Sequence, residues 1–382
     1  MKYGRLKVII SGGGTGGHIF PALSIADKLK ELNPETEILF VGALGRMEME
    51  KVPAAGYRIE GLPVSGLQRK LTLSNLALPF KVLKSIRMAK RLIREFKPDI
   101  AIGVGGYASA PLLWAAGRLG IPTLIQEQNG YAGLTNKIVG KKAKSICVAY
   151  DGMERFFPAE RIVFSGNPIR KEIVPSTEQM REDAMKFYGL DPKKKHIFIV
   201  GGSLGSGTLN NAMKKWINDG CLGGDNVEVI WQCGKYYKPS VDEFMKEAKK
   251  NGTGGVCLAH IQHSDFIKRM DLAYAAADIV ISRSGASSVS ELCAAHKATI
   301  FVPSPNVAED HQTHNAMALV NKAAAILVKD SEAVEKLLPT ACALIENAEQ
   351  ITILEKNIAT LAKTDAAMTI AEETYRVVGE KR

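Results

Sequence analysis

Short runs of apolar residues alternate with longer amphipathic stretches along most of the chain. In the first half, the apolar runs predict β-strands at 7–11, 37–41, 99–104, 122–126, 145–148 and 161–164. In the second half, they predict strands at 196–200, 227–232, 255–259, 279–282, 299–302 and 325–328. Strands that alternate with helical stretches are typical of parallel α/β layers. The pattern therefore predicts two doubly wound halves.

The two sets of strands are separated by the sequence Gly166-Asn167-Pro168. Proline disfavours helical geometry in the residue before it, so this tripeptide is the natural hinge. We expect an N-terminal domain over 1–166 and a C-terminal domain over 167–363, with the helical stretch 364–382 packing back on the first. A chain of 382 residues is long enough for two separate cores.

Glycine-rich turns follow three of the predicted strands, at 12–17, 103–106 and 201–207. After the first turn, Phe20 and Pro21 are expected to open a helix, since proline favours the first helical position. A strand, a glycine turn and a helix N-terminus present backbone amides to an anionic ligand. Each turn is therefore a candidate binding site.

A dinucleotide site at the first turn is one interpretation, because Gly12, Gly14 and Gly17 have the G-x-G-x-x-G spacing. Such a site also needs an acid at the end of the second strand to bind the ribose, and none occurs there before Glu48. A P-loop is also disfavoured, because His18 follows the glycines in place of Lys and Ser or Thr. The sequence therefore argues against both sites.

The second half offers better groups for a nucleotide. The Ser203 hydroxyl and the amides of its turn can hold a diphosphate against the helix expected at 209–216. Glu291 follows a small-residue turn at 283–288, and its carboxylate can accept two hydrogen bonds from a ribose diol. The alternative for the Ser203 turn is a tight turn that binds no ligand. The alternative for Glu291 is an acid that only favours the start of its helix.

Two polar stretches remain. Four polar side chains in a row at 126–129 end a strand and are expected to form a sugar-binding rim. The stretch 306–315 contains Asp310, His311 and His314, but no third spaced ligand completes a metal site and no D-x-D triplet occurs. We therefore expect a hydrogen-bonding loop and no metal.

The formal charge of +10 is concentrated in one segment, 69–97, which holds nine Lys or Arg residues and the single acid Glu95. Apolar residues are interleaved with these charges, so the segment can lie on an anionic membrane surface. A solvated helix face is the plainer alternative. Nucleic acid is a third, disfavoured because Phe80 is nearly alone as an aromatic platform.

Composition is that of an ordinary globular protein, with 46% apolar and 24% charged residues. The uncharged stretch 100–117 has about the minimum length of a membrane span, but its glycines and proline favour a strand and turn. The six cysteines form no C-x-x-C pair, and we expect separate core thiols in a reducing compartment.

Taken together, the motifs resemble those of a known family. They lie at 12–22, 103–107, 127–130, 134–137, 166–170, 201–203 and 283–291, nearly the full length of the chain. They are similar to those of the bacterial cell-wall N-acetylglucosaminyltransferases of the GT-B class. This family transfers N-acetylglucosamine from UDP-GlcNAc to lipid I, undecaprenyl-pyrophosphoryl-MurNAc-pentapeptide, and forms lipid II.

The resemblance implies a GT-B fold, an α/β architecture of two Rossmann-like doubly wound parallel-sheet domains that face an interdomain cleft. It implies no cofactor and no metal. The expected partners are UDP-GlcNAc, lipid I, an anionic membrane surface through 69–97, and other cell-wall synthesis proteins, but no nucleic acid. The expected location is peripheral, on the cytoplasmic face of the bacterial inner membrane.

The resemblance also implies roles for single residues. Residues expected to contact the nucleotide sugar are Thr15, Gly16, Gly17, Asn129, Arg170, Ser203, Ile267, Ala286, Ser287, Ser288, Val289, Ser290, Glu291 and Gln312. Residues expected on the acceptor side are Gly13, Gly14, Gly105, Gly106 and Tyr107. The sequence departs from some members of the family at His311 and Gln126, which affects only fine sugar contacts.

The implied chemistry is a single inverting displacement, which needs a base for the proton of the muramyl 4-hydroxyl. His18 is the first candidate because a neutral imidazole suits pH 7, and Glu127 is its rival. A ring that only caps the turn is the structural alternative for His18. For the whole chain, the alternatives are a UDP-sugar epimerase of the same fold and a non-catalytic, nucleotide-responsive membrane adaptor.

Overall fold

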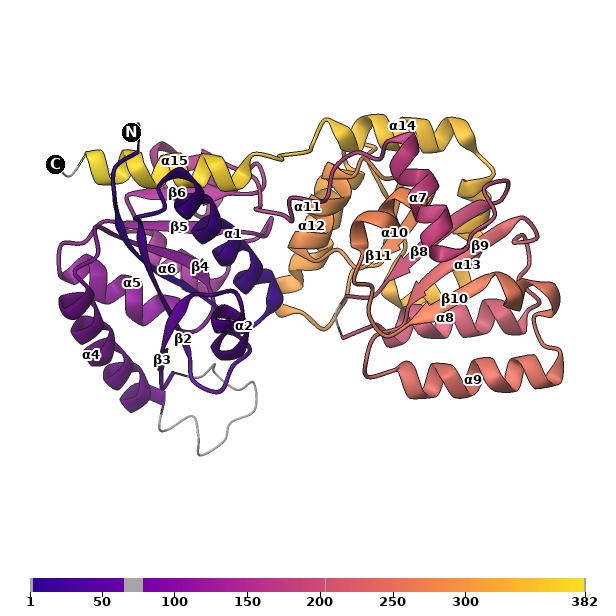
Figure 1. The fold of residues 1–382 in the computed structure, drawn as a ribbon, viewed down its shortest axis with the longest axis horizontal. Coiled ribbons are helices and arrows are strands. Elements are labelled where there is room, and N and C mark those ends of the chain that lie inside the picture. Colours follow the sequence, from indigo (N-terminus) through magenta and orange to yellow (C-terminus); the bar gives the residue numbers. More distant parts are fainter. Residues whose placement is uncertain (1–2, 65–77, 203, 381–382) are drawn as a thin grey trace. The chain divides into compact units, whose positions relative to one another are not determined.

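The computed structural model describes residues 3–64, 78–202 and 204–380 (Figure 1). Residues 69–77 of the basic segment and Ser203 lie outside the described residues. The chain divides into two compact units. The N-terminal unit comprises Met1–Ile169 together with Lys363–Arg382, and the C-terminal unit comprises Arg170–Ala362. The C-terminal segment of the chain thus belongs to the first unit.

The described part of the N-terminal unit contains a seven-stranded, all-parallel sheet in the order β3-β2-β1-β4-β5-β6-β7. The strands are β1 Lys7–Gly12, β2 Glu37–Ala43, β3 Arg58–Leu62, β4 Ile100–Gly105, β5 Thr123–Glu127, β6 Ser145–Val148 and β7 Ile162–Phe164. The strand order reverses between β1 and β4. In doubly wound sheets, ligands bind beyond the carboxyl ends of the strands at such a switch point.

Helices cover both faces of this sheet. They are α1 Gly16–Leu32, α2 Glu48–Ala54, α4 Leu78–Phe96, α5 Ser109–Arg118, α6 Leu134–Gly140 and α15 Ala366–Gly379. Figure 1 shows α15, in yellow, beside α1, in indigo. The Tyr375 hydroxyl of α15 donates to the Gly4 carbonyl over 3.0 Å, and the rings of Tyr3 and Tyr375 are 4.9 Å apart.

Side chains of β1 alternate between two apolar cores, one on each face of the sheet. Val8 and Ile10 are buried in one apolar cluster with α1 and α15, whereas Ile9 is buried in the other with α4 and α5. Successive side chains of a strand point to opposite faces, so a strand buried on both faces needs an unbroken apolar run. This is why β1 and β4 were readily predicted.

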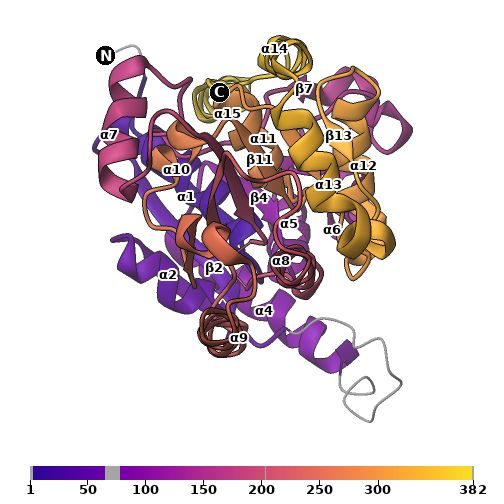
Figure 2. The ribbon, with the colours of Figure 1, turned by 90° about the vertical axis from the view of Figure 1, so that its right-hand side faces the viewer.

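The described part of the C-terminal unit contains a six-stranded parallel sheet in the order β10-β9-β8-β11-β12-β13, which reverses between β8 and β11. The strands are β8 Lys195–Val200, β9 Val227–Gln232, β10 Ile261–Ser264, β11 Ile279–Ser282, β12 Thr299–Phe301 and β13 Ile326–Leu327. The helices are α7 Glu178–Tyr188, α8 Gly207–Asn218, α9 Lys238–Asn251, α10 Met270–Ala276, α11 Ala286–Ala294, α12 His311–Val320, α13 Ala333–Ile345 and α14 Ala348–Ala359. Figure 2 shows α7 beside α10.

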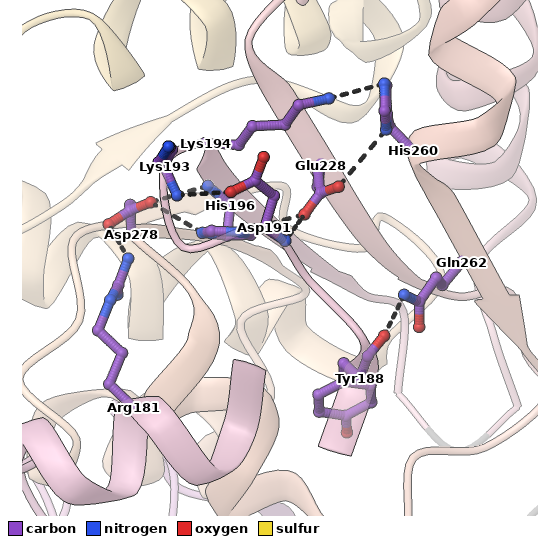
Figure 3. Close-up of polar contacts among 10 residues, drawn as sticks. All are labelled: Arg181, Tyr188, Asp191, Lys193, Lys194, His196, Glu228, His260, Gln262 and Asp278. Atoms are coloured by element: carbon purple, nitrogen blue, oxygen red, sulfur yellow. Dashed lines mark hydrogen bonds and ion pairs between the residues drawn. The ribbon is translucent and has the colours of Figure 1, made fainter. Parts of the chain in front are cut away.

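A polar cluster ties together the amino-terminal ends of strands in the C-terminal unit (Figure 3). The buried His196 ring lies between Glu228, 3.3 Å from Nε2, and Asp278, 3.5 Å from Nδ1. Asp278 also accepts from the His196 backbone amide over 2.7 Å and from Arg181 over 2.8 Å. Burial raises the pKa of Asp278, but these partners outweigh it and leave the pKa below its ordinary value.

Two strand assignments from the sequence are corrected by the structure, whereas the other predicted strands are confirmed to within two residues at their ends. The stretch 255–259 is not a strand but part of a 3-10 helix, Gly255–His260, because Gly254 and Gly255 adopt positive φ angles. The strand β10 follows it. The edge strand β3 was missed, since its sequence, RIEGL, carries two charges and a glycine and no apolar run.

Two further expectations are corrected. Helix α1 begins at Gly16 and contains Pro21, so His18 lies in the first turn of the helix rather than before it. Cys221 and Cys257 form a disulfide, with Cα atoms 6.4 Å apart, where separate thiols were expected. They come from distant parts of the sequence, so spacing gave no indication of the pair. Cys147, Cys233, Cys293 and Cys342 are free and buried, as expected.

Candidate active site

The two glycine turns of the N-terminal unit interlock at the switch point of its sheet. The pairing of β1 with β4 shifts after Ser11, so that Gly12 lies opposite Gly105. The Gly13 amide then donates to the Gly105 carbonyl over 3.3 Å. The turn after β1 and the turn after β4 therefore form one structure at the carboxyl edge of the sheet, which is the edge where ligands are expected.

His18 points its ring back into this turn. Its Nδ1 atom lies 3.0 Å from the Gly13 carbonyl oxygen and 3.2 Å from Thr15 Oγ1. A carbonyl oxygen only accepts hydrogen bonds, so Nδ1 carries the proton when the ring is neutral. That tautomer leaves the acceptor lone pair on Nε2, which is then the basic nitrogen of the ring.

The position of the His18 ring explains why glycine is required at 105. A Cβ atom at Gly105 would lie 2.6 Å from Cδ2 and 2.8 Å from Nε2 of His18, and the φ angle there is +102°. A Cβ atom at Gly106 would lie 2.5 Å from the Gly13 carbonyl oxygen. The second turn therefore lacks side chains because His18 and the first turn occupy the space.

Glu48, the first residue of α2, is a functional candidate that the sequence analysis did not assign. Its side chain is buried and accepts from the Gly14 amide over 2.8 Å and from the Ala43 amide over 3.0 Å. A Cβ atom at Gly13 would lie 2.3 Å from the Glu48 carboxyl carbon. The Gly14 amide, expected to be open to a ligand, is therefore already bound by a carboxylate of the same chain.

Glu127 is buried at the end of β5 and surrounded by donors. It accepts from the amides of Asn129 and Gly133 over 3.1 and 3.0 Å, and from Asn136 Nδ2 over 2.9 Å. Burial raises the pKa of Glu127, and these hydrogen bonds oppose the rise. With both oxygens engaged, the carboxylate fixes the course of the loop that follows β5.

The polar run 126–129 does not form the exposed rim that was expected. Gln126, Glu127 and Gln128 are buried, and Gln126 Nε2 donates to Asn167 Oδ1 over 2.8 Å. Gln128 donates to the Val104 carbonyl over 2.6 Å. These amides anchor the hinge to the sheet, because internal hydrogen bonds make burial of polar groups tolerable.

Two other predicted residues of this unit lie nearer the surface. Asn129 is partly buried, and Tyr107 is 45% exposed. The Arg46 guanidinium lies 5.8 Å from the centre of the Tyr107 ring. These side chains are accessible at the carboxyl edge of the N-terminal sheet, unlike Glu127.

Arg283 joins three turns at the carboxyl edge of the C-terminal sheet. Its Nη2 donates to Ser206 Oγ over 2.7 Å, and its Nη1 donates to the Val302 carbonyl over 2.9 Å. It also forms an ion pair with Asp330. Arg283 therefore holds the turns after β8, β11 and β12 in place and stabilises the frame of the site.

The structure brings Arg170 and Glu291, both predicted from the sequence, close together. The Arg170 Nε atom lies 3.5 Å from Glu291 Oε1, and the Tyr274 hydroxyl donates to Oε2 over 3.3 Å. Burial raises the pKa of Glu291, while the Arg170 charge and the Tyr274 hydrogen bond oppose it. A carboxylate accepts from hydroxyl groups and a guanidinium binds phosphate, so the pair suits a nucleoside diphosphate.

Gln312 and the start of α11 complete the predicted set in this unit. The Gln312 side-chain oxygen accepts from the Ser304 amide over 2.9 Å, which fixes the loop before α12. Ile267 and Val289 are buried. Four residues in the first turns of α11 are partly exposed: Ala286, Ser287, Ser288 and Ser290. No cluster of three or more His, Cys, Asp or Glu side chains suited to a metal ion occurs within the described ranges.

Two all-parallel α/β units, each with turns at the switch point of its sheet, have the architecture of the GT-B class, as the resemblance implied. Models of known families agree with this class. The glycosyltransferase family 28 N-terminal domain matches residues 8–148, and the family 28 C-terminal domain matches residues 196–371. The chain belongs to glycosyltransferase family 28.

Relatives match over nearly the full chain. A Parabacteroides distasonis protein named UDP-N-acetylglucosamine--N-acetylmuramyl-(pentapeptide) pyrophosphoryl-undecaprenol N-acetylglucosamine transferase is 52% identical, covering 99% of this chain and 100% of the relative. A Bacteroides fragilis protein of the same name is 55% identical, covering 97% and 96%. The crystal structure of Acinetobacter baumannii MurG is similar, with a TM-score of 0.76, 29% identity, and 96% and 99% covered.

Proposed function

We propose that the chain transfers N-acetylglucosamine from UDP-GlcNAc to the 4-hydroxyl of the muramyl sugar of lipid I and forms lipid II. The observation that carries this proposal is the similarity to named N-acetylglucosamine transferases, which extends over both units at 52 and 55% identity. The turns after β1 and β4 and the turns after β8 and β11 lie at the switch points of the two sheets, where doubly wound folds bind ligands, and this supports the proposal.

The C-terminal unit holds the donor in this proposal. Glu291 accepts hydrogen bonds from the ribose hydroxyls, and Arg170 binds the diphosphate. The start of α11 favours the phosphates through the dipole of the helix. The Ile267 backbone reads the uracil, and Gln312 contacts the sugar. Ser203, outside the described residues, is proposed as a further diphosphate contact.

The N-terminal unit supplies the acceptor side and the base. Nε2 of His18 takes the proton of the muramyl 4-hydroxyl while its oxygen attacks the anomeric carbon and the bond to UDP breaks. Inversion gives a β-1,4 link, and UDP leaves with the bond electrons. The acceptor side further comprises Gly13, Gly14, Gly105, Gly106 and Tyr107, while Thr15, Gly16, Gly17 and Asn129 contact the transferred sugar. No metal or cofactor takes part in the proposed reaction.

The geometry favours His18 over Glu127 as the base. The Nδ1 bond to Gly13 directs the basic lone pair of His18 to Nε2. Glu127 is buried, and its oxygens already accept from Asn129, Gly133 and Asn136. We therefore propose that Glu127 positions the Asn129 loop and that His18 takes the proton.

Helix α4 is the proposed membrane contact. Its residues Ser85, Ala89 and Ile93 are buried against the unit, whereas Phe80, at the start of the helix, is 76% exposed. Its outward side chains include Lys84, Arg87 and Arg91. On the neighbouring α5, Trp114 is 41% exposed, with Lys90 and Arg118 over its ring at 5.4 and 5.1 Å. No helix among the described residues is long and apolar enough to span a bilayer.

This arrangement supports a peripheral location on the cytoplasmic face of the inner membrane. Each cation near an anionic surface contributes about 1 kcal/mol to binding. We expect the triple Gln variant of Lys84, Arg87 and Arg91 to bind phosphatidylglycerol vesicles much more weakly in a sedimentation assay. A control with Gln at Lys246, Lys249 and Lys250, exposed on α9, removes the same charge and should bind as wild type. Unaltered vesicle binding by the α4 variant would favour a solvated face for α4.

The transfer itself is tested with radiolabelled UDP-GlcNAc and a short-chain lipid I analogue. We expect label in the lipid product, one UDP released per sugar transferred, and equal rates with and without EDTA. Epimerised UDP-sugar as the sole product would contradict the proposal in favour of an epimerase. Donor binding without turnover would favour the adaptor.

A further inference from the structure

Glu48 and His18 bond to opposite sides of one peptide group. The Gly14 amide donates to Glu48 Oε2 over 2.8 Å, and the Gly13 carbonyl accepts from His18 Nδ1 over 3.0 Å. That carbonyl and that amide belong to the same planar unit, because the peptide bond joins Gly13 to Gly14. In a trans peptide, the C=O and N–H groups point in opposite directions, so the carboxylate and the imidazole bond to opposite sides of the same peptide group.

We propose that Glu48 is a positioning residue for the reaction and acts on His18 through the Gly13–Gly14 peptide group. The inference deepens the proposed function, because it assumes that His18 takes the proton. The carboxylate polarises the amide, and a polarised peptide has a more negative carbonyl oxygen. The Gly13 carbonyl therefore holds the Nδ1 proton of His18 more firmly than an ordinary carbonyl does.

Such an arrangement has two consequences for a general base. It fixes the tautomer with the proton on Nδ1, so that Nε2 is the basic nitrogen. It also stabilises the positive charge that develops on the ring as Nε2 takes the substrate proton. A buried aspartate does the same for histidine in a Ser-His-Asp triad by direct contact. Here the peptide group transmits the effect.

The surroundings of Glu48 are built to admit its carboxylate. A Cβ atom at Gly13 would lie 2.3 Å from the carboxyl carbon, and one at Gly42 would lie 2.6 Å from Glu48 Cγ. The Ala43 amide donates to the second oxygen over 3.0 Å. Favouring the start of α2 needs no such burial, since an exposed acid in the first turn also interacts favourably with the helix dipole.

The test reads the His18 tautomer directly, by nitrogen NMR of the full-length protein with ¹⁵N-labelled histidine. The chain has seven histidines, and the signals lost in His18→Gln assign the ring. Glu48→Gln keeps the shape of the side chain but removes the charge. Glu50→Gln is the matched control, because Glu50 is an exposed acid on the same helix. Thermal unfolding and UDP-GlcNAc binding verify that the variants are folded.

We expect wild type and Glu50→Gln to show His18 protonated on Nδ1, and Glu48→Gln to shift toward the Nε2-protonated form. The kcat of Glu48→Gln should fall about 10- to 100-fold, the range found when a group that orients a metal-bound histidine is removed. Its KM for UDP-GlcNAc should stay within about twofold of wild type, because the residues proposed to bind the uridine and the diphosphate lie in the C-terminal unit. A folded Glu48→Gln protein with wild-type tautomer and kcat would overturn the inference.

The wild-type spectrum tests the inference even if Glu48→Gln does not fold. An Nε2-protonated His18 in the wild type would overturn the inference, because Nδ1 would then have no hydrogen to donate to the Gly13 carbonyl. A failure of the proposed function itself would be recognised from the transfer rate of His18→Gln. If His18→Gln transfers sugar at the wild-type rate, His18 is not the base, whatever its tautomer.

Discussion

Substitution of Gly105 by alanine probes the packing of His18 more directly than any change to the ring itself. The added Cβ atom would lie 2.6 Å from Cδ2, so the ring must recede by about 0.8 Å to regain ordinary contact at 3.4 Å. A displacement of about 1 Å in a reacting group costs roughly 100-fold in rate, equivalent to about 2.7 kcal/mol. We therefore expect kcat for sugar transfer to fall about 100-fold, with little change in UDP-GlcNAc binding.

The backbone at Gly105 is itself strained for alanine, because its φ angle is +102°. A conformation of this kind costs on the order of 1–3 kcal/mol in stability. Gly120→Ala separates the two effects, since Gly120 has a φ angle of +72° and a Cβ atom there meets nothing within 4 Å. Chemical denaturation should show a loss of stability in both variants, and steady-state transfer kinetics a loss of kcat in Gly105→Ala alone. If both variants retain wild-type kcat, contact with Gly105 does not hold the imidazole in place.

Two further substitutions test the C-terminal unit. Asp278→Asn should cost about 1.5–3 kcal/mol of stability near pH 7, because Asp278 bonds the His196 amide and Arg181. The folded pKa of Asp278 is below its ordinary 3.8, so its contribution is present above that pH and lost as the pH falls through the folded pKa. Urea unfolding at a series of pH values should show the two proteins converging in acid, and a constant difference would contradict this assignment. Glu291→Ala should weaken UDP binding about 10- to 100-fold by calorimetry, through the loss of charge-assisted hydrogen bonds, and an unchanged Kd would exclude a ribose contact.

Most of the fold was predictable because buried parallel strands impose a simple pattern. Strands such as β1 are covered on both faces, so their apolar runs are unbroken and the strands could be recognised in the sequence. The edge strand β3 lacks this constraint and escaped prediction. At 255–259, apolar residues were present, but the positive φ angles of Gly254 and Gly255 direct the chain into a helical turn.

The site was predictable in its residues but less so in their partners. Glycines at 12–17 indicated a binding turn, but the sequence did not show that Gly13 makes room for Glu48, which is distant along the chain. The polar run 126–129 was taken for a rim because periodicity does not distinguish exposed amides from buried, internally bonded ones. Arg170 and Glu291 were both predicted as site residues, but only the structure shows that they form an ion pair.

The role of His18 is tested most directly by measuring two properties of His18→Ala side by side. Single-turnover transfer from UDP-GlcNAc to the lipid I analogue should slow by at least about 100-fold, the lower range for loss of a general base. UDP-GlcNAc affinity, measured by calorimetry, should stay within about twofold, because the proposed donor residues lie mainly in the C-terminal unit. A wild-type transfer rate, or a loss of affinity as large as the loss of rate, would contradict the proposed division between a base in one unit and a donor site in the other.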